Sequence, residues 1–145
     1  YCDYIIINEV EASMLSDLPP YNDNGDLNIP NIRKTMEFIA EHGVKEKIII
    51  HCKKAGFCLD VATGDFTAVP SLKIPAQEIK GSVGAGDAFC AGCLYGLYNG
   101  YQSRQILEFA SAVAACSLLE ANSVDGMKPK KEILKLANKY GRLTL

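Results

Sequence analysis

Two short apolar runs, separated by a helical pattern, constrain the fold of this chain more than any other feature. Residues 3–7 (D-Y-I-I-I) and 47–52 (K-I-I-I-H-C) have no polar face, which is typical of strands buried on both sides of a sheet. Between them, helices are predicted at 8–16, where Asn8 is followed by acidic residues, and at 31–42. This alternation predicts an α/β fold in which helices flank a layered sheet.

The rest of the chain continues this pattern with a larger share of helix. Residues 56–61 and 66–69 flank the sequence A-T-G-D and predict an antiparallel hairpin. The helix predicted at 102–119 is rich in small residues, which indicates tight packing against a sheet. The other predicted helices lie at 85–98 and 130–140, and the predicted loops lie at 19–30, around Pro70 and Pro75, and at 120–126.

Composition narrows the function classes. The chain has 145 residues, 48% hydrophobic and 22% charged, with a formal net charge of −2, as expected for one globular domain. Lys and Arg are spread along the chain, which argues against a nucleic-acid partner. The apolar runs are too short to cross a membrane. We expect a cytoplasmic protein whose six cysteines are buried free thiols.

The glycine-rich segment 81–92, G-S-V-G-A-G-D-A-F-C-A-G, leads into a predicted helix and has three interpretations. A dinucleotide-binding loop is excluded because Phe89 stands where the third glycine of G-x-G-x-x-G is needed. A Walker loop is excluded because Asp87 and Ala88 replace the Lys and the Ser or Thr that contact phosphate and magnesium. The remaining simple interpretation is a glycine turn, with Asp87 as an acid favoured by the helix dipole.

A carboxylate at this position is nevertheless unusual for a phosphate-binding loop. The backbone N–H groups of Ala85, Gly86 and Asp87 would converge at the helix N-terminus and form an anion hole. A phosphate beside Asp87 would be repelled unless a substrate hydroxyl lay between them. Asp87 would then accept the hydroxyl proton while the amides stabilise the transferring phosphoryl group. The segment therefore predicts a phosphoryl-transfer site.

The same segment resembles the C-terminal signature of the ribokinase-like sugar kinases, also called the phosphofructokinase-B family, D-T-x-G-A-G-D-x-F-x-A-G. The resemblance implies a three-layer, Rossmann-like α/β fold and transfer of a phosphoryl group from ATP, with Mg²⁺, to a hydroxyl of a sugar or related small molecule. It further implies Asp87 as the catalytic base and Gly84, Ala85 and Gly86 as the anion hole. The matching residues are Gly84, Ala85, Gly86, Asp87, Phe89, Ala91 and Gly92.

A second motif supports the resemblance. Residues 8–11, N-E-V-E, follow a predicted strand and are similar to the N-x-x-E motif of the family. There the Asn and the second Glu organise magnesium and its waters around the nucleotide phosphates, which implies Asn8 as a cofactor-binding residue and Glu11 as a Mg²⁺ ligand through water. Alone the motif is weak, because any helix that starts with Asn and acids looks the same.

Three positions depart from the family pattern. Gly81 stands where relatives carry an Asp that helps to ligate a monovalent cation, so a cation site is doubtful in this chain. In H-C-K-K-A-G, 51–56, Gly56 matches the family's T-x-G-x-x-G whereas Lys53 replaces its first glycine, and Lys53 either contacts a phosphate or is merely solvated. Asn122 is the candidate for a nucleotide contact in the predicted loop 120–126.

Members of this family are longer than this chain. Residues 1–145 are predicted to form the C-terminal ATP-binding and catalytic part, without the substrate-binding half and the lid, so the isolated chain is expected to be inactive. A sheet cut in this way exposes an edge, which predicts an N-terminal half or a second copy as partner. The alternatives are a non-catalytic nucleotide-binding or assembly module, and a nucleoside kinase of the same family.

Overall fold

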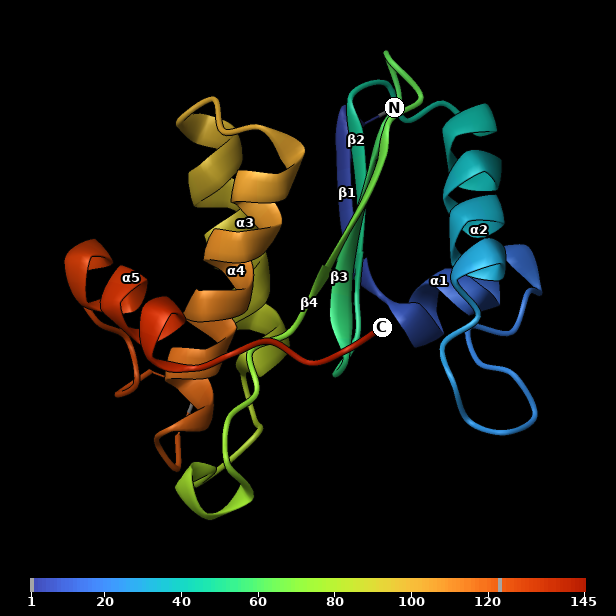
Figure 1. Ribbon diagram of the computed structural model, residues 1–145. Helices are drawn as coiled ribbons and strands as arrows, with labels where there is room; N and C mark the ends of the chain where they lie inside the picture. The colour runs from blue at the N-terminus through green and yellow to red at the C-terminus, as the bar shows by residue number, and fades with distance from the viewer. Residues whose placement is uncertain (1, 123) are drawn as a thin grey trace. The chain divides into compact units, whose positions relative to one another are not determined.

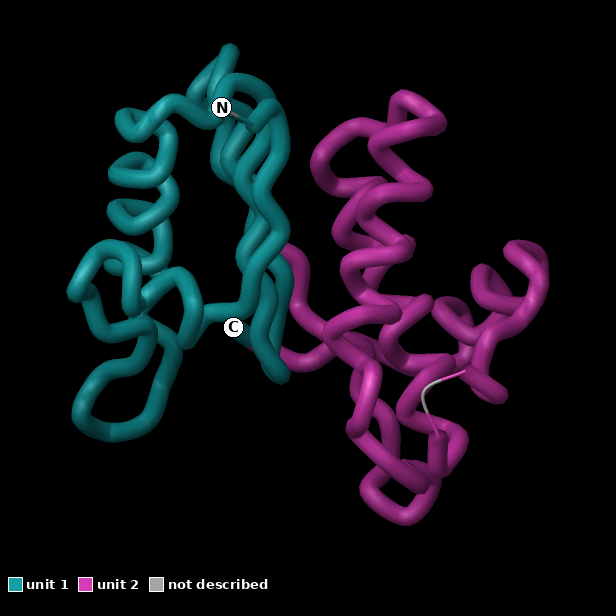
Figure 2. The backbone as a smooth tube through the Cα atoms, turned by 180° about the vertical axis from the view of Figure 1, so that it is seen from behind, with its two compact units in different colours: residues 1–68, 145 teal, residues 69–144 magenta. Residues whose placement is uncertain are grey.

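The structure is a computed structural model that describes residues 2–122 and 124–145 (Figure 1). The described residues form two compact units, one up to residue 68 together with residue 145, and one of residues 69–144 (Figure 2). In chain order the elements are β1 (Tyr4–Asn8), α1 (Glu9–Ser16), α2 (Ile29–Glu41), β2 (Lys47–His51), β3 (Ala55–Asp60), β4 (Phe66–Pro70), the 3-10 helix η1 (Ala76–Glu78), α3 (Ala85–Tyr98), α4 (Ser103–Leu118) and α5 (Lys130–Lys139).

The four strands form one mixed sheet in the order β1-β2-β3-β4. β1 and β2 are parallel, with Tyr4 opposite Lys47 and Asn8 opposite His51, and β2 and β3 are antiparallel. The parallel pair is joined by a crossover through α1 and α2, as parallel strands require. The register brings the carboxyl ends of β1 and β2 to the same edge, where ligands commonly bind in α/β proteins.

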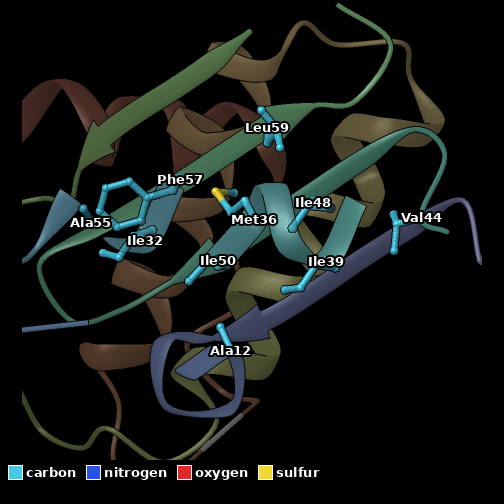
Figure 3. Close-up of a cluster of buried hydrophobic side chains, with 10 residues drawn as sticks. All are labelled: Ala12, Ile32, Met36, Ile39, Val44, Ile48, Ile50, Ala55, Phe57 and Leu59. Carbon is cyan, nitrogen blue, oxygen red and sulfur yellow. The ribbon is translucent and has the colours of Figure 1, made fainter. Parts of the chain in front are cut away.

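The core of the first unit lies between α2 and the sheet (Figure 3). Met36 of α2 is fully buried among Ile48 and Ile50 of β2 and Phe57 of β3. Ile49 is also fully buried, as expected for a strand without a polar face. The α/β layering expected from the sequence is confirmed.

The second unit contains α3, α4 and α5. α3 and α4 are closely packed, because Gly92 on α3 faces the backbone of Ala110 on α4 and Gly96 faces Ile106 one turn further along. α5 adds Ile133 to the core that includes Phe109, Ala112 and Cys116 of α4. The tight packing predicted for the small residues of α4 is present against another helix, α3, and the expected packing against a sheet stays a prediction.

Replacing Gly92 with alanine should destabilise this helix pair. An added Cβ would lie 2.7 Å from Cα of Ala110, so the helices must separate. We expect the free energy of unfolding to fall by about 1–3 kcal/mol, although Ala is otherwise the better helix former. Urea unfolding measures this, with Gly141→Ala as the control because a Cβ there has nothing within 4 Å. An unchanged midpoint for Gly92→Ala would show that the contact is not tight in solution.

Several sequence expectations need correction. The predicted loop 19–30 was wrong at its end, because α2 begins at Ile29, where Asn28 accepts the Asn31 N–H at 3.0 Å and Pro30 fits the first turn. The six cysteines are free, but Cys2 is exposed and two others are half-buried.

Among the described residues, no helix has both the length and the apolar character that crossing a membrane requires. The cytoplasmic location stays a prediction.

Candidate active site

The N-E-V-E motif lies where β1 ends and α1 begins. The Asn8 carboxamide oxygen accepts the N–H groups of Val10 and Glu11 at 3.0 and 2.8 Å, and Glu11 Oε2 accepts the Asn8 N–H at 2.9 Å. The two side chains thus form a capping box, which explains why the helix starts here. Glu11 is exposed, and a carboxylate can accept about four hydrogen bonds, so the cap uses only part of its capacity.

The H-C-K-K-A-G segment forms the turn between β2 and β3. The Cys52 N–H donates to the Ala55 carbonyl at 2.8 Å and closes the turn, which leaves Lys53 exposed at its tip. Gly56 is buried in β3, opposite His51. Because His51 is also opposite Asn8, this turn and the N-E-V-E motif lie at the same edge of the sheet.

The glycine-rich segment forms the N-terminus of α3. Gly84 is the N-cap, with φ of 81°, a left-handed conformation that favours glycine. The Ala85 N–H reaches the Ser82 carbonyl at 3.3 Å. For the N–H groups of Gly86 and Asp87, by contrast, the described part of the chain offers no hydrogen-bond acceptor. Two adjacent amides at the start of α3 are thus unpaired, as is usual in the first turn of a helix and as an anion-binding site would require.

Asp87 is exposed in the first turn of α3, next to these amides. Cys90 lies one turn further along. Burial raises the pKa of the Cys90 thiol, and the negative charge of Asp87 adds to the increase. Asp87 and Cys90 therefore share one side of the helix, with Asp87 at the end where the free amides lie.

Gly81 and the loop that follows α4 lie against each other. A Cβ on Gly81 would be 3.0 Å from the Ala121 carbonyl oxygen and 3.2 Å from that of Glu120. An Asp at position 81, as the family signature has it, would require this loop to shift. The expectation that a monovalent-cation site is doubtful stays a prediction, supported by this crowding.

Asn122 organises its own loop. Its carboxamide oxygen accepts the N–H groups of Val124 and Asp125, and its Nδ2 donates to the Asp125 carboxylate at 2.7 Å. A nucleotide contact by Asn122 would have to use the remaining capacity of this side chain or replace these bonds.

The predicted site residues thus fall into sets within the two units. Asn8, Glu11 and Lys53 gather with Gly56 at one edge of the sheet in the first unit. The second unit holds the G-A-G-D segment and, separately, Asn122. The described residues contain no cluster of three or more His, Cys, Asp or Glu side chains suited to hold a metal.

Two further residues lie at this edge of the sheet without any signal in the sequence, Tyr21 and Lys54. The Tyr21 hydroxyl donates to Glu9 at 2.8 Å, and Lys54 lies 3.8 Å from the Asp26 carboxylate. Both contacts join residues far apart in the chain, for which periodicity carries no signal.

Comparison with known proteins identifies the family. A family model described as pfkB family carbohydrate kinase matches residues 1–143. The chain belongs to this family. It is 30% identical over 98 residues to 1-phosphofructokinase of Escherichia coli (strain K12), covering 65% of this chain and 30% of that protein. It is 26% identical over 134 residues to ribokinase of Arabidopsis thaliana, covering 92% of this chain and 33% of that protein. The chain thus spans about a third of the length of these relatives.

Solved structures show the same fold. A putative sugar kinase from Clostridium perfringens matches with a TM-score of 0.74 and 21% identity, over 96% of this chain and 40% of that one. Arabidopsis thaliana ribokinase complexed with ribose and ATP matches with a TM-score of 0.73 and 24% identity, over 93% and 40%. A putative ribokinase II from E. coli in complex with ATP and Mg²⁺ matches with a TM-score of 0.69 and 17% identity, over 94% and 39%. The ribokinase-like α/β fold is confirmed.

Proposed function

We propose that this chain is the nucleotide-binding and catalytic part of a kinase that transfers the γ-phosphoryl group of ATP to a hydroxyl of a sugar or related small molecule. The observation that carries the proposal is the N-terminus of α3, where Gly84 turns the chain and the amides of Gly86 and Asp87 have no acceptor among the described residues. These amides lie beside the exposed carboxylate of Asp87.

In this proposal Asp87 is the catalytic base. The amides of Gly86 and Asp87 line the anion hole, and Gly84 and Ala85 shape the backbone around it. The carboxylate accepts the proton of the acceptor hydroxyl as the new O–P bond forms and the bond to ADP breaks. The amides stabilise the negative charge on the transferring phosphoryl group. The acceptor hydroxyl between carboxylate and phosphate separates the two negative charges.

The carboxyl edge of β1 and β2 is proposed to hold the nucleotide phosphates and magnesium. Glu11 supplies a hard oxygen ligand that suits Mg²⁺ and its waters. The Asn8 carboxamide oxygen is used by the capping box, which orients both side chains, and its Nδ2 is left to donate to a phosphate oxygen. Bound magnesium would neutralise phosphate charge. Lys53, exposed at the adjacent turn, offers a cation for a phosphate oxygen, and Gly56 is buried in β3 directly after this turn.

The acceptor class rests on the relatives. Those with curated names include kinases of sugars and sugar phosphates, and one similar structure is a Burkholderia thailandensis nucleoside kinase in complex with inosine. A sugar is therefore proposed first and a nucleoside second. Because this chain spans only about a third of these relatives, we propose that an N-terminal half or a second copy completes the acceptor site. A non-catalytic nucleotide-binding module is the alternative.

Release of ADP from ATP and Mg²⁺ tests the proposal. The panel holds sugars, sugar phosphates and nucleosides, and the assay uses this chain and any longer natural product that contains it. We expect the longer product to turn over one acceptor class and to lose this activity in Asp87→Asn, whereas this chain alone is expected to be inactive. Nucleotide binding without turnover by either protein on any acceptor would support the binding-module alternative.

A further inference from the structure

The segment between α1 and α2 is ordered by its own hydrogen bonds. Tyr21 and Leu27 form an antiparallel bridge, and the Asn22 N–H donates to the Asp26 carbonyl at 2.8 Å. Gly25, with φ of 82°, makes the turn between them. Residues 21–27 therefore form a small hairpin, which we call the α1–α2 hairpin.

Tyr21 joins this hairpin to the ends of two strands. Its hydroxyl donates to Glu9 Oε1 at 2.8 Å and lies against Cys52. Glu9 directly follows Asn8, and Cys52 directly follows His51. Asn8 and His51 lie opposite each other in the sheet. One phenol thus contacts the first residue beyond β1 and the first residue beyond β2.

The Tyr21 hydroxyl is held as a hydrogen-bond donor. Burial raises the pKa of Tyr21 above its ordinary value, and the hydrogen bond to the Glu9 carboxylate adds to the increase. The phenol therefore stays protonated at neutral pH. The Glu9 carboxylate in turn accepts a hydrogen bond from the phenol, which partly compensates its negative charge at the sheet edge.

A second contact ties the hairpin to the β2–β3 turn. Lys54 Nζ lies 3.8 Å from Asp26 Oδ1 and 3.5 Å from the Gly25 carbonyl oxygen. Lys54 is thereby engaged with the hairpin, whereas its exposed neighbour Lys53 has no ion pair within the described residues. The hairpin contacts both segments that carry the proposed phosphate and magnesium ligands.

We propose that Tyr21 is a positioning residue for the nucleotide phosphates, and this inference rests on the proposed function. By bridging Glu9 and Cys52 it fixes the N-E-V-E motif relative to the H-C-K-K-A-G turn, so that Asn8, Glu11 and Lys53 are placed before ATP binds. Preorganisation of this kind lowers the cost of binding. Without the hydroxyl, the Glu9 carboxylate would lose its donor and repel the incoming phosphates.

Tyr21→Phe tests the inference, because it keeps the ring and removes only the hydroxyl. We expect the Kd for ADP with Mg²⁺ and the KM for ATP to rise about 3- to 10-fold, the range that one hydrogen bond accounts for. The kcat at saturating ATP should stay within a factor of two of the wild-type value. The matched control is Tyr98→Phe, since Tyr98 is 92% exposed.

Glu9→Gln supplies a second readout that a purely structural role would not change. Glutamine keeps an acceptor for the hydroxyl but removes the charge, so Tyr21→Phe should weaken nucleotide binding less in the Glu9→Gln background than in the wild type. Equal effects in both backgrounds would contradict the role assigned to the Glu9 charge and overturn the inference.

Other outcomes separate this inference from the proposed function. Wild-type nucleotide affinity in Tyr21→Phe, or a loss of affinity explained by an equal loss of folded protein in urea unfolding, would overturn the inference alone. If the wild type binds ADP but phosphorylates no acceptor, the proposed function fails, and the nucleotide affinity of Tyr21→Phe still decides the inference. A wild type that binds no nucleotide overturns both.

Discussion

Replacing Asp87 with asparagine is expected to lower kcat by about 10²- to 10⁴-fold, the usual contribution of a positioned general base. Asparagine has nearly the same shape and cannot accept the hydroxyl proton at neutral pH. The amides of Gly86 and Asn at position 87 remain in place, because Gly84 sets the turn. Nucleotide affinity should therefore stay the same or rise slightly, since a negative charge beside the phosphates has been removed.

The measurement is kcat with the acceptor identified in the panel, together with the Kd for ADP by calorimetry. Asp65→Asn is the matched control, because it makes the same substitution at an exposed position in the turn between β3 and β4, outside the proposed site. Equal activity of the two variants would mean that Asp87 is only a helix-start acid, and the base would have to be sought elsewhere.

The sequence predicted the elements that depend on local patterns. β1, β2 and α3 appear at the expected places because apolar runs and a glycine-rich start are local signals. The start of α2 was misplaced because Pro30 was assigned to the loop, although proline suits the first turn of a helix whose cap is Asn28.

The candidate site was predictable only as a set of residues, and their surroundings were not. The G-A-G-D segment and N-E-V-E motif are recognisable in the chain, whereas the contact of Gly92 with Ala110, like that of Tyr21 with Glu9, arises from tertiary packing. Asn122 shows what a motif leaves out. Its position in the loop predicted a nucleotide contact, whereas in the structure its side chain forms hydrogen bonds to Asp125 of the same loop.

Glu11 carries two roles that one pair of substitutions separates. As the third residue of α1 it completes the capping box, and as a proposed ligand it orders the waters of magnesium. Glu11→Gln keeps an oxygen for the Asn8 N–H and so preserves the cap, since glutamine also serves in capping boxes. We expect its free energy of unfolding to be unchanged, while the Mg²⁺ concentration for half-maximal activity rises about 10- to 100-fold.

Glu11→Ala should lose both roles, with an additional fall of about 0.5–2 kcal/mol in the free energy of unfolding. The experiment is a Mg²⁺ titration of activity at fixed ATP, paired with urea unfolding of each variant. If the titration of Glu11→Gln coincides with that of the wild type, the motif is only a helix cap. Magnesium must then be bound through the nucleotide and residues other than Glu11. If it shifts while unfolding does not, the same carboxylate both starts the helix and binds the metal, because the cap holds it at the edge where the phosphates arrive.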